Sequence, residues 1–462
     1  MSDLRHYTWC QFFMGENIME YTKEYWINCG KRSLRYAKIF LKWCIIATVI
    51  GTLCGAVGTA FHYSVEYVTG VRENHSFIIN FLPFAGLIIV FLYRVSGMKH
   101  DKGTNLVIGS IRDQNLTIPF KMAPLIFIST VITHMFGGSA GREGAALQLG
   151  GSMGSTLGKL SKLSDDDRHI MTLCGMSAVF AALFGTPITA TLFSMEVISI
   201  GILYFCALVP CALSAIIAYA ITCVFNITPT NFVLKQVPEI NIEIGLKVGV
   251  LGICCAVLAV LFCMLMHMAS DFFKHFFKNQ YVRIFVGGLI IVILTHLIGN
   301  TDYNGAGMGI ITNAIHGDAK PYAFLLKMLF TCVTIGCGFR GGEIVPAFFI
   351  GSTFGCALGN LMGLDPATSA AVGLVCFFCA VVNCPLTSIL LGIELFGSDG
   401  LILFAIACAI SYMMSGYYSL YSEQKIIYSK LRPHYVNLYT NKEVHTAARK
   451  DEHSADQPEL DE

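Results

Sequence analysis

Residues 137–154 are the feature that most constrains the fold of this chain. The segment reads Gly-Gly-Ser-Ala-Gly-Arg-Glu-Gly-Ala-Ala-Leu-Gln-Leu-Gly-Gly-Ser-Met-Gly, and it contains seven glycines and the ionisable pair Arg142 and Glu143. Long apolar runs flank it, and a charged side chain at membrane depth costs roughly 2.5–3.5 kcal/mol. Non-helical backbone is tolerated there only where it is buried in protein or lines a cavity. We therefore predict a broken helix whose N-terminal amides, from about Gly144 onward, point at an anion site.

The amino-acid composition is that of a polytopic membrane protein. Apolar residues make up 55% of the chain and charged residues only 13%, with a mean hydropathy of +0.62, whereas about a quarter of a soluble protein is charged. The net charge of +1 gives no indication of a nucleic-acid partner. The eighteen cysteines are scattered through apolar runs, where free cysteine behaves as a small hydrophobe. We therefore expect neither a metal site nor a cofactor.

Basic residues cluster at both ends of the apolar region. They include Lys31, Arg32 and Arg35 before it and Lys425, Lys430 and Arg432 after it. Because Lys and Arg are enriched in cytoplasmic loops, both ends are expected in the cytoplasm, with an even number of crossings between them. We expect a cytoplasmic segment over 1–35 without a signal peptide, a transmembrane domain over 36–430, and a polar, acidic, disordered cytoplasmic tail over 431–462.

The transmembrane domain is interrupted by many glycines and prolines. Its apolar runs cover 39–71, 77–95, 122–136, 170–184, 202–225 and 243–270, and then 283–298, 323–338, 366–382, 386–397 and 400–417. Many of them are shorter than the roughly twenty residues that a helix needs to span a bilayer. Short, interrupted apolar pieces indicate discontinuous helices that meet near the membrane midplane. We therefore predict an all-α fold with broken and tilted helices.

Two proline-led segments show that the second half of the chain repeats the first. Phe184-Gly-Thr-Pro187 leads to Glu196 nine residues after the proline. Val382-Asn-Cys-Pro385 leads to Glu394 with the same spacing, at an offset of 198 residues.

Two glycine-containing segments repeat in the same order. The segment from Gly141 to Gly154 matches the segment from Gly342 to Gly355 at an offset of 201, and Lys102-Gly-Thr-Asn matches Asn304-Gly-Ala-Gly at 202. Matches at a nearly constant offset indicate an internal duplication, with repeats over about 36–225 and 240–430. An inverted second repeat would bring the broken helices together about a pseudo-twofold axis.

Together these segments resemble the CLC family of chloride channels and anion/proton antiporters. The resemblance covers about residues 36–430 and rests on Gly141-Arg-Glu-Gly144, Gly341-Gly342-Glu-Ile-Val-Pro346 and Leu420-Tyr421-Ser422. It implies an inverted-repeat membrane fold, a homodimer embedded in membrane lipid, and one anion pathway in each subunit. The nucleotide-binding tail domains of eukaryotic members are not expected, because residues 431–462 are too few for them.

The resemblance implies a role for each matching residue. Glu143 matches the external gating glutamate, whose carboxylate competes with the anion and carries the proton. Tyr421 matches an inner tyrosine whose hydroxyl faces the central anion, and Glu343 and Ile344 match positions whose backbone amides line that site. The implied anion-binding residues are Asn105, Gly141, Arg142, Gly144, Ile344, Val345 and Tyr421, and the implied proton-transfer and gating residues are Glu143 and Glu343.

Several residues distinguish this chain from the common family pattern. Asn105 and Glu343 resemble the fluoride-exporting bacterial branch, because chloride-selective members carry a serine at the first position and an apolar residue at the second. Val197 stands where chloride/proton antiporters carry an inner proton-transfer glutamate, which the channels also lack. Val345 departs from a threonine of the fluoride branch, and Ala145 departs from the usual proline.

The two glutamates at the glycine-rich breaks have structural alternatives. Glu143 could pair with Arg142 and only hold the loop together, but adjacent side chains rarely face each other, and an ionisable residue inside the membrane marks a functional site. Glu343 could pair with Arg340. In its functional role it is a second protonatable group, because a carboxylate in a desolvated cavity can exchange protons near neutral pH.

Other candidates also have more than one interpretation. Asn105 could be a turn residue after a glycine, whereas its amide NH₂ offers two donors to a small anion. Tyr421 alone would fit interfacial packing. Glu196 and Glu394 are related by the repeat and fit structural roles at helix ends better than transport. His134 is expected to be a structural or pore-lining residue.

These observations predict a fluoride/proton antiporter of the plasma membrane, such as a bacterial inner membrane, that expels fluoride with the proton gradient. The alternative is a chloride channel or chloride/proton antiporter of the same family, in which Asn105 is incidental. An enzyme is disfavoured, because the sequence has no HExxH motif and no intramembrane Ser/His pair or paired aspartates.

Overall fold

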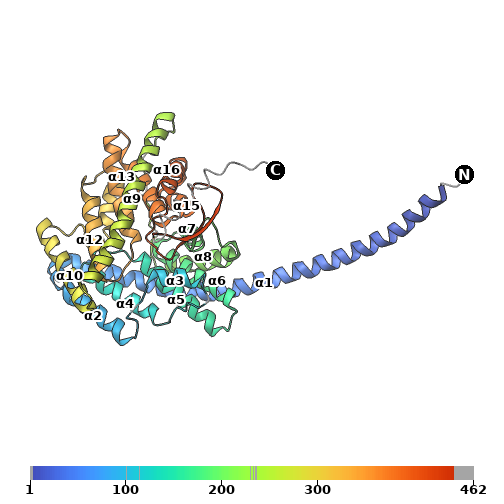
Figure 1. The fold of residues 1–462 in the computed structure, drawn as a ribbon, viewed down its shortest axis with the longest axis horizontal. Coiled ribbons are helices and arrows are strands. Elements are labelled where there is room, and N and C mark those ends of the chain that lie inside the picture. Colours follow the sequence, from blue (N-terminus) through green and yellow to red (C-terminus); the bar gives the residue numbers. More distant parts are fainter. Residues whose placement is uncertain are drawn as a thin grey trace.

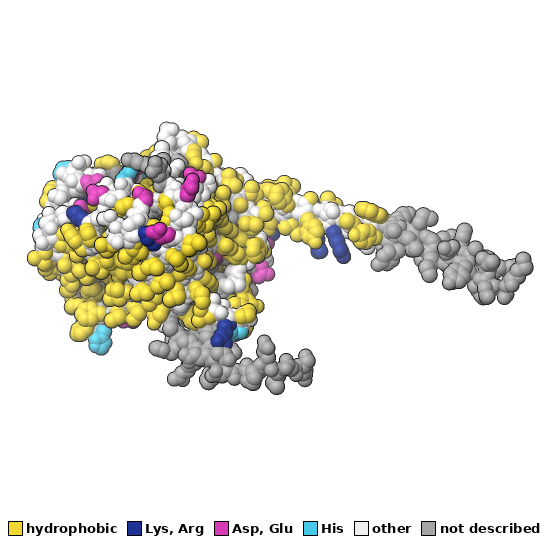
Figure 2. All heavy atoms as spheres, turned by 90° about the horizontal axis from the view of Figure 1, so that it is seen from above, with side chains coloured by type: hydrophobic (Ala, Val, Ile, Leu, Met, Phe, Trp, Pro, Cys, Tyr) yellow, Lys and Arg dark blue, Asp and Glu magenta, His cyan; other side chains and the backbone are white. Residues whose placement is uncertain are grey.

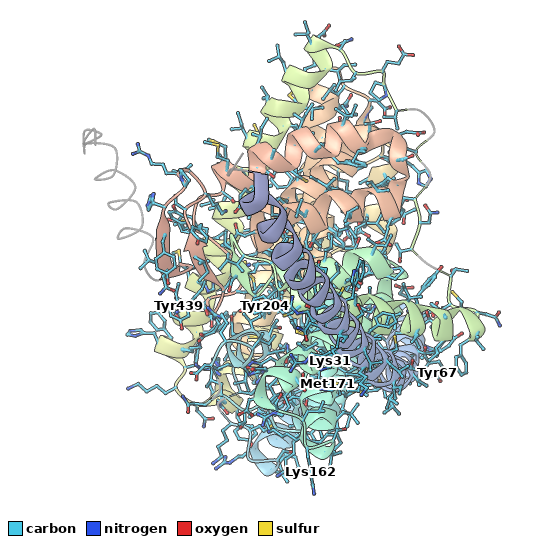
Figure 3. All side chains as sticks on the ribbon, turned by 90° about the vertical axis from the view of Figure 1, so that its right-hand side faces the viewer. Lys31, Tyr67, Lys162, Met171, Tyr204 and Tyr439 are labelled. Carbon is cyan, nitrogen blue, oxygen red and sulfur yellow. The ribbon has the colours of Figure 1, made fainter. Side chains whose placement is uncertain are left out.

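The computed structural model describes the chain from residue 4 to residue 441, apart from residues 100, 114, 229, 233, 235 and 236, with side chains described from residue 25 onward. It is a bundle of helices of very different lengths (Figure 1). The first helix, α1 (Leu4–Asn74), extends far out of the bundle at its N-terminal end. Figure 3 follows this helix from Lys31 to Tyr67. No break marks the expected boundary between residues 35 and 36, because α1 runs through it.

The helices of the first half agree closely with the predicted runs. They are η1 (Ser76–Phe81), α2 (Leu82–Val95), α3 (Thr104–Ser110), α4 (Met122–Met135), α5 (Glu143–Leu160), α6 (Asp165–Phe184), α7 (Pro187–Glu196), η2 (Phe205–Ala207) and α8 (Leu208–Val224).

The second half continues in the same order. Its helices are α9 (Ile242–Phe276), α10 (Gln280–Ile298), α11 (Met308–Ile315), α12 (Ala323–Cys337), α13 (Ile344–Leu361), α14 (Pro366–Val382), α15 (Pro385–Phe396), η3 (Ser398–Gly400) and α16 (Leu401–Met414).

The chain is a multi-pass membrane protein. Within the described residues, six helical segments are long and apolar enough to cross a membrane, namely Tyr25–Asn74, Ser76–Val95, Phe205–Val224, Ile242–Phe276, Gln280–Ile298 and Ile344–Leu361. Further apolar helices such as α4, α12 and α14 have only 10–17 residues. Apolar side chains dominate a broad face of the bundle, and the charged side chains gather toward one edge of it (Figure 2). The prediction of short helices beside full spans is therefore confirmed.

The corresponding helices α6 and α14 of the two repeats begin and end with similar local structures. α6 follows Ser164, whose hydroxyl accepts from the Asp167 amide at 3.3 Å, and it ends at Gly185 with φ +72°. α14 follows Asp365, which caps its helix in the same way, and it ends at Asn383 with φ +58°. A short polar cap and a left-handed last residue are common helix boundaries. The next helices, α7 and α15, then begin with proline, as the sequence predicts.

The two repeats also pack alike. α5 crosses α6 where Gly150 lies against Gly175, and α13 crosses α14 where Gly351 lies against Gly373. Neither crossing leaves room for a Cβ atom, so glycine is needed at both. These two helix pairs form the centre of the bundle.

The C-terminal residues form a small sheet that the sequence analysis missed. β2 (Lys425–Tyr428) pairs in parallel with β1 (Ser199–Ile200) and antiparallel with β3 (Tyr435–Tyr439). Val436 and Leu438 point to a buried apolar cluster, as expected for alternate residues of a strand. The prediction of a disordered tail is therefore wrong for residues 431–441, and residues 442–462 lie outside the described part of the chain.

Candidate functional site

The two glycine-rich breaks meet in an antiparallel backbone bridge. The Gly141 amide donates to the Gly342 carbonyl at 2.7 Å, and the Gly342 amide donates to the Gly141 carbonyl at 2.7 Å. A Cβ atom at Gly144 would lie 2.8 Å from the Cα of Gly342, so this close approach requires glycine. Each repeat contributes the matching residue to the bridge, as a pseudo-twofold axis demands.

Two helix N-termini begin directly at this bridge. α5 begins at Glu143 after Arg142, and α13 begins at Ile344 after Glu343. The amide N–H groups in the first turn of each helix have no carbonyl partner within the helix, and they lie at the positive end of the helix dipole. The predicted broken helix within 137–154 is confirmed, and the second repeat supplies a matching helix end beside it.

Glu143 lines a cavity of about 710 Å³ beside the C-terminal end of α1, which we call the outer cavity. Its side chain is 2% exposed, and its Oε1 lies 3.5 Å from Nε of Arg142. Its Oε2 accepts from the Arg142 amide at 2.9 Å. The expectation that these adjacent side chains do not face each other is therefore wrong, because the carboxylate folds back over Gly141 and reaches its neighbour. The carboxylate therefore accepts a hydrogen bond from a backbone amide near the helix end that would otherwise be free to bind an anion.

Glu343 lies on the other side of the same bridge. One of its carboxylate oxygens, Oε2, is buried and has no hydrogen-bond partner within the described residues. This oxygen is directed at Gly144, because a Cβ atom there would lie 3.0 Å from it. The structural alternative, pairing with Arg340, is wrong, since Arg340 donates from Nη1 to Oδ2 of Asp101 at 3.1 Å instead. Glu343 is thus a half-buried residue at a helix N-terminus, with one buried carboxylate oxygen and no cation paired to it in the described chain.

Tyr421 is almost fully buried near both carboxylates. Its exposed fraction is 2%, and its hydroxyl has no hydrogen-bond partner within the described residues. Glu343, Cys384 and Glu143 are its charged or titratable neighbours. A buried hydroxyl without a partner is costly unless a ligand or water satisfies it. This geometry favours a ligand-facing tyrosine over one that only packs at a membrane interface.

Asn105 holds two segments together at the inner side of the site. Its carbonyl Oδ1 accepts from the Glu423 amide at 3.1 Å, two residues after Tyr421. The preceding residue, Thr104, faces the helix end more closely, since its hydroxyl donates to the Gly144 carbonyl at 3.3 Å and accepts from Nε2 of Gln148 at 3.1 Å. Sequence reasoning assigned no role to Thr104, although it is the polar residue next to the glycine of the break.

Glu196 and Glu394 cap each other's repeats. The Glu196 carboxylate accepts from the amides of Leu386 and Thr387, at 3.2 and 2.9 Å, at the start of α15. The Glu394 carboxylate accepts from the Ile188 and Thr189 amides, at 3.0 and 2.8 Å, at the start of α7. Carboxylates stabilise helix N-termini in this way. The expected structural role of both residues at helix ends is confirmed, although each serves the opposite repeat.

Two buried cations lie in the wall of the outer cavity or directly behind it. Arg72 is 6% exposed and donates from Nη1 to the His134 carbonyl at 2.9 Å, and both residues line the cavity. Lys327 is fully buried and donates to the Gly305 carbonyl at 2.6 Å and the Tyr303 carbonyl at 3.2 Å. Sequence reasoning missed both. The signal for Lys327 was a single lysine inside the apolar run 323–338, which is costly without a role.

Comparison with known proteins places this geometry in a family. The model of the family described as voltage gated chloride channel matches residues 84–416. The chain belongs to this family, the CLC family. Its members are transporters and channels, so the predicted resemblance and the CLC-type fold are both confirmed.

The relatives of this CLC chain include fluoride-handling members. A chloride/fluoride channel protein of Pseudomonas syringae pv. tomato is 35% identical over 395 residues, which is 84% of this chain and 87% of that protein. A solved structure described as a CLC-type fluoride/proton antiporter is 34% identical with a TM-score of 0.80, and the match covers 83% of this chain and 98% of that one. An H⁺/Cl⁻ exchange transporter of Vibrio campbellii is 26% identical, over 82% of this chain and 86% of that protein.

Most of the residues that the sequence singled out lie together in this CLC structure. Gly141, Arg142, Glu143 and Gly144 adjoin Glu343, Ile344 and Val345 across the bridge, and Tyr421 lies within electrostatic range of both carboxylates. Asn105 lies one hydrogen bond away from the Tyr421 segment rather than at the bridge. The structure therefore places two helix N-termini and two carboxyl groups at one site.

Proposed function

We propose that this chain is a fluoride/proton antiporter that uses the proton gradient to expel fluoride from the cytoplasm. The observation that carries the proposal is the meeting of Glu143 and Glu343 at two helix ends joined by the Gly141–Gly342 bridge. The helix ends favour an anion, and the two carboxyl groups supply two places for a proton. The likeness to a chloride/fluoride channel protein and to a CLC-type fluoride/proton antiporter supports fluoride as the anion.

Glu143 performs the external step of the proposed cycle. In its charged form, the Glu143 carboxylate accepts a hydrogen bond from the Arg142 amide and lies beside the Arg142 guanidinium, where it takes the place of an anion. When a proton arrives from the outer cavity, the neutral carboxyl group loses most of its attraction for these donors. Fluoride can then take the helix-end amides around Gly144, and the proton moves inward with Glu143.

Glu343 and Tyr421 perform the internal step. The unpartnered Oε2 of Glu343 accepts a proton or releases one, and the unpartnered hydroxyl of Tyr421 donates to the anion. The amides of Ile344 and Val345 hold the anion from the second repeat. The amide NH₂ of Asn105 completes the inner end of the anion path, while its carbonyl keeps the Tyr421 segment in place.

The location and assembly follow from charge and family. The basic residues at both ends of the membrane region support cytoplasmic termini, and the relatives named above support a cell membrane, such as a bacterial inner membrane. The chain works as a homodimer with one anion path in each subunit. The mass of the detergent-purified protein, measured by light scattering with the detergent subtracted, tests the dimer, and a value of one chain would reject it.

The experiment that tests the function is efflux from liposomes loaded with fluoride or with chloride. An ion-selective electrode records the anion, and a pH electrode records protons outside. We expect fluoride efflux that moves protons in the opposite direction and much slower chloride efflux. Rapid chloride efflux without proton movement would instead make the chain a chloride channel.

A matched pair of variants makes the test specific to the site. Glu143→Gln removes a titratable group that lines the outer cavity and is expected to abolish proton coupling. Glu66→Gln removes an exposed carboxylate that lines the same cavity, and coupled fluxes are expected to persist in it. Fluoride-driven proton movement of wild-type size in Glu143→Gln would reject the assigned role.

A further inference from the structure

A second cavity, of about 370 Å³, lies where α2 ends and α9 turns into α10. Five cationic side chains and one carboxylate line it. The cations are Lys99, Lys274, Lys278, Arg283 and Arg340, and the carboxylate is that of Asp101. Such an excess of positive charge around a cavity calls for an anionic ligand.

The two arginines in the wall of this basic cavity are held by contacts within the protein. The Arg340 guanidinium lies 4.2 Å from the centre of the Tyr93 ring and donates to Asp101 at 3.1 Å. Arg283 donates from Nε to the Cys337 carbonyl at 3.3 Å. Asp101 therefore neutralises Arg340 and no other cation of the cavity. The segment that carries Lys99 is bonded to the start of α10, because Nε2 of Gln280 donates to the Lys99 carbonyl at 2.9 Å.

The lysines at the mouth of the cavity lack close counter-ions. Lys99 and Lys278 are exposed, and neither makes an ion pair within the described residues. Lys274 comes no closer than 3.9 Å to Asp271, and both side chains are largely exposed. These three ammonium groups can therefore turn to a ligand without breaking a bond in the protein.

Apolar surface adjoins the cavity. Phe84, Ile88, Phe91 and Val95 recur along one face of α2, and each is at least half exposed. Met268, Phe272 and Phe276 form a similar exposed row toward the end of α9. In a membrane protein such rows face acyl chains. The cavity is thus a basic pocket at the edge of the lipid-facing surface rather than in an aqueous vestibule.

The topology sets the side of the membrane. α1 crosses once and α2 returns, so the end of α2 lies on the same side as the start of the apolar part of α1, which basic residues mark as cytoplasmic. α10 runs antiparallel to α2, since Gly288 packs on Pro83 and Gly86 on Ile284, so its N-terminus lies at the same level. Anionic lipids enrich this leaflet, and basic pockets between helices bind their headgroups.

We propose that this basic cavity binds the phosphate headgroup of an anionic membrane lipid, with its acyl chains along the exposed rows of α2 and α9. Lys99, Lys274 and Lys278 contact the phosphate, and Arg340 with Arg283 forms the back wall. The bound lipid joins the 99–101 segment to the α9–α10 turn. This proposal concerns a different cavity from the one that Glu143 lines, and it does not depend on which ion is carried.

The test is the retention of lipid by the purified full-length protein, measured by native mass spectrometry with equal amounts of phosphatidylglycerol and phosphatidylcholine. We expect the wild type to retain phosphatidylglycerol in preference to phosphatidylcholine. Each lysine near an anionic headgroup contributes roughly fivefold, so Lys99→Gln with Lys278→Gln should lower that preference by roughly 25-fold. The matched control, Lys159→Gln with Lys162→Gln, removes two exposed lysines from the α5–α6 turn and should leave the preference unchanged.

Two results would overturn the proposal. One is the same preference for phosphatidylglycerol in the cavity variant and the control variant. The other is displacement of the retained lipid by millimolar inorganic phosphate, which would make this a site for free phosphate. Both lysine pairs are exposed, so all variants should fold, and elution of a single peak in size-exclusion chromatography checks this.

Discussion

Replacing Glu196 by Gln tests whether the two repeats are held together by exchanged helix caps. The Glu196 carboxylate accepts three hydrogen bonds, from the amides of Leu386 and Thr387 and from the Thr387 hydroxyl at 2.6 Å. A hydrogen bond to a charged group contributes roughly 1.5–3 kcal/mol, and a charge at a helix N-terminus contributes up to about 2 kcal/mol. Gln keeps one acceptor oxygen but loses the charge and turns a donor NH₂ toward an amide donor. We therefore expect the variant to lose roughly 2–4 kcal/mol of stability.

The measurement is unfolding of the purified protein in detergent micelles, followed by tryptophan fluorescence. Thr387→Val and the double variant complete a double-mutant cycle, which isolates the energy of the contact between the two side chains. Glu394→Gln is the matched comparison from the opposite repeat. Its carboxylate accepts two amide bonds and is more exposed than that of Glu196, so its loss should be smaller. Proton-coupled fluoride exchange in the surviving folded fraction should be retained in both variants.

The reasoning would be refuted if Glu196→Gln were within about 0.5 kcal/mol of the wild type, the range of substitutions away from specific structural contacts. It would also be refuted by a stable variant that had lost proton coupling. That outcome would place Glu196 in the proton path instead of at the end of α15.

Three further outcomes follow from the site and its surroundings. Gly144→Ala places a Cβ atom 2.8 Å from Gly342 Cα, so the two helix ends must move apart. This movement should lower the stability by roughly 1–3 kcal/mol. It should also abolish fluoride efflux from liposomes. Glu343→Gln should slow or stop both fluoride and proton fluxes in the same assay, and wild-type rates would return Glu343 to a structural role. Burial lowers the pKa of Lys430 to about 7, whereas a lysine in the unfolded chain titrates near pH 10.4. Between these two pH values the unfolded chain therefore binds more protons than the folded protein. The free energy of unfolding should then rise with pH across that window. Melting temperatures recorded from about pH 7 to about pH 10 should therefore rise less in Lys430→Met than in the wild type.

Local signals predicted the parts of the fold that depend on nearby residues. Pro187 and Pro385 set the first turns of α7 and α15, because proline has no amide to lose there. The constant offset between the halves then predicted a duplication, and the Gly141–Gly342 bridge is its most direct consequence. These features need only the chemistry of single residues and their spacing.

Contacts between distant segments were not predictable in the same way. The choice of Arg340 to pair with Asp101 instead of Glu343 depends on where the segment after α2 folds back, about 240 residues earlier in the chain. The small sheet likewise joins Ile200 of β1 to Ile426 of β2, and β1 has no partner strand nearby in sequence. Arg72 directly follows the apolar run 39–71, and its burial against the His134 carbonyl depends on a segment about 60 residues further along the chain.

The charges at the two helix ends break the symmetry that the backbone keeps. At the offset of 201 residues, Arg142 corresponds to Glu343, and Glu143 corresponds to Ile344. One helix end therefore carries a cation and a carboxylate in contact, whereas the other carries a carboxyl group alone. Arg142 can balance Glu143 when it is charged, but only a proton can balance Glu343 within the described chain. Two sites with the same backbone thus differ in how they are neutralised, and the proposed cycle uses this difference by giving Glu143 the external step and Glu343 the internal one.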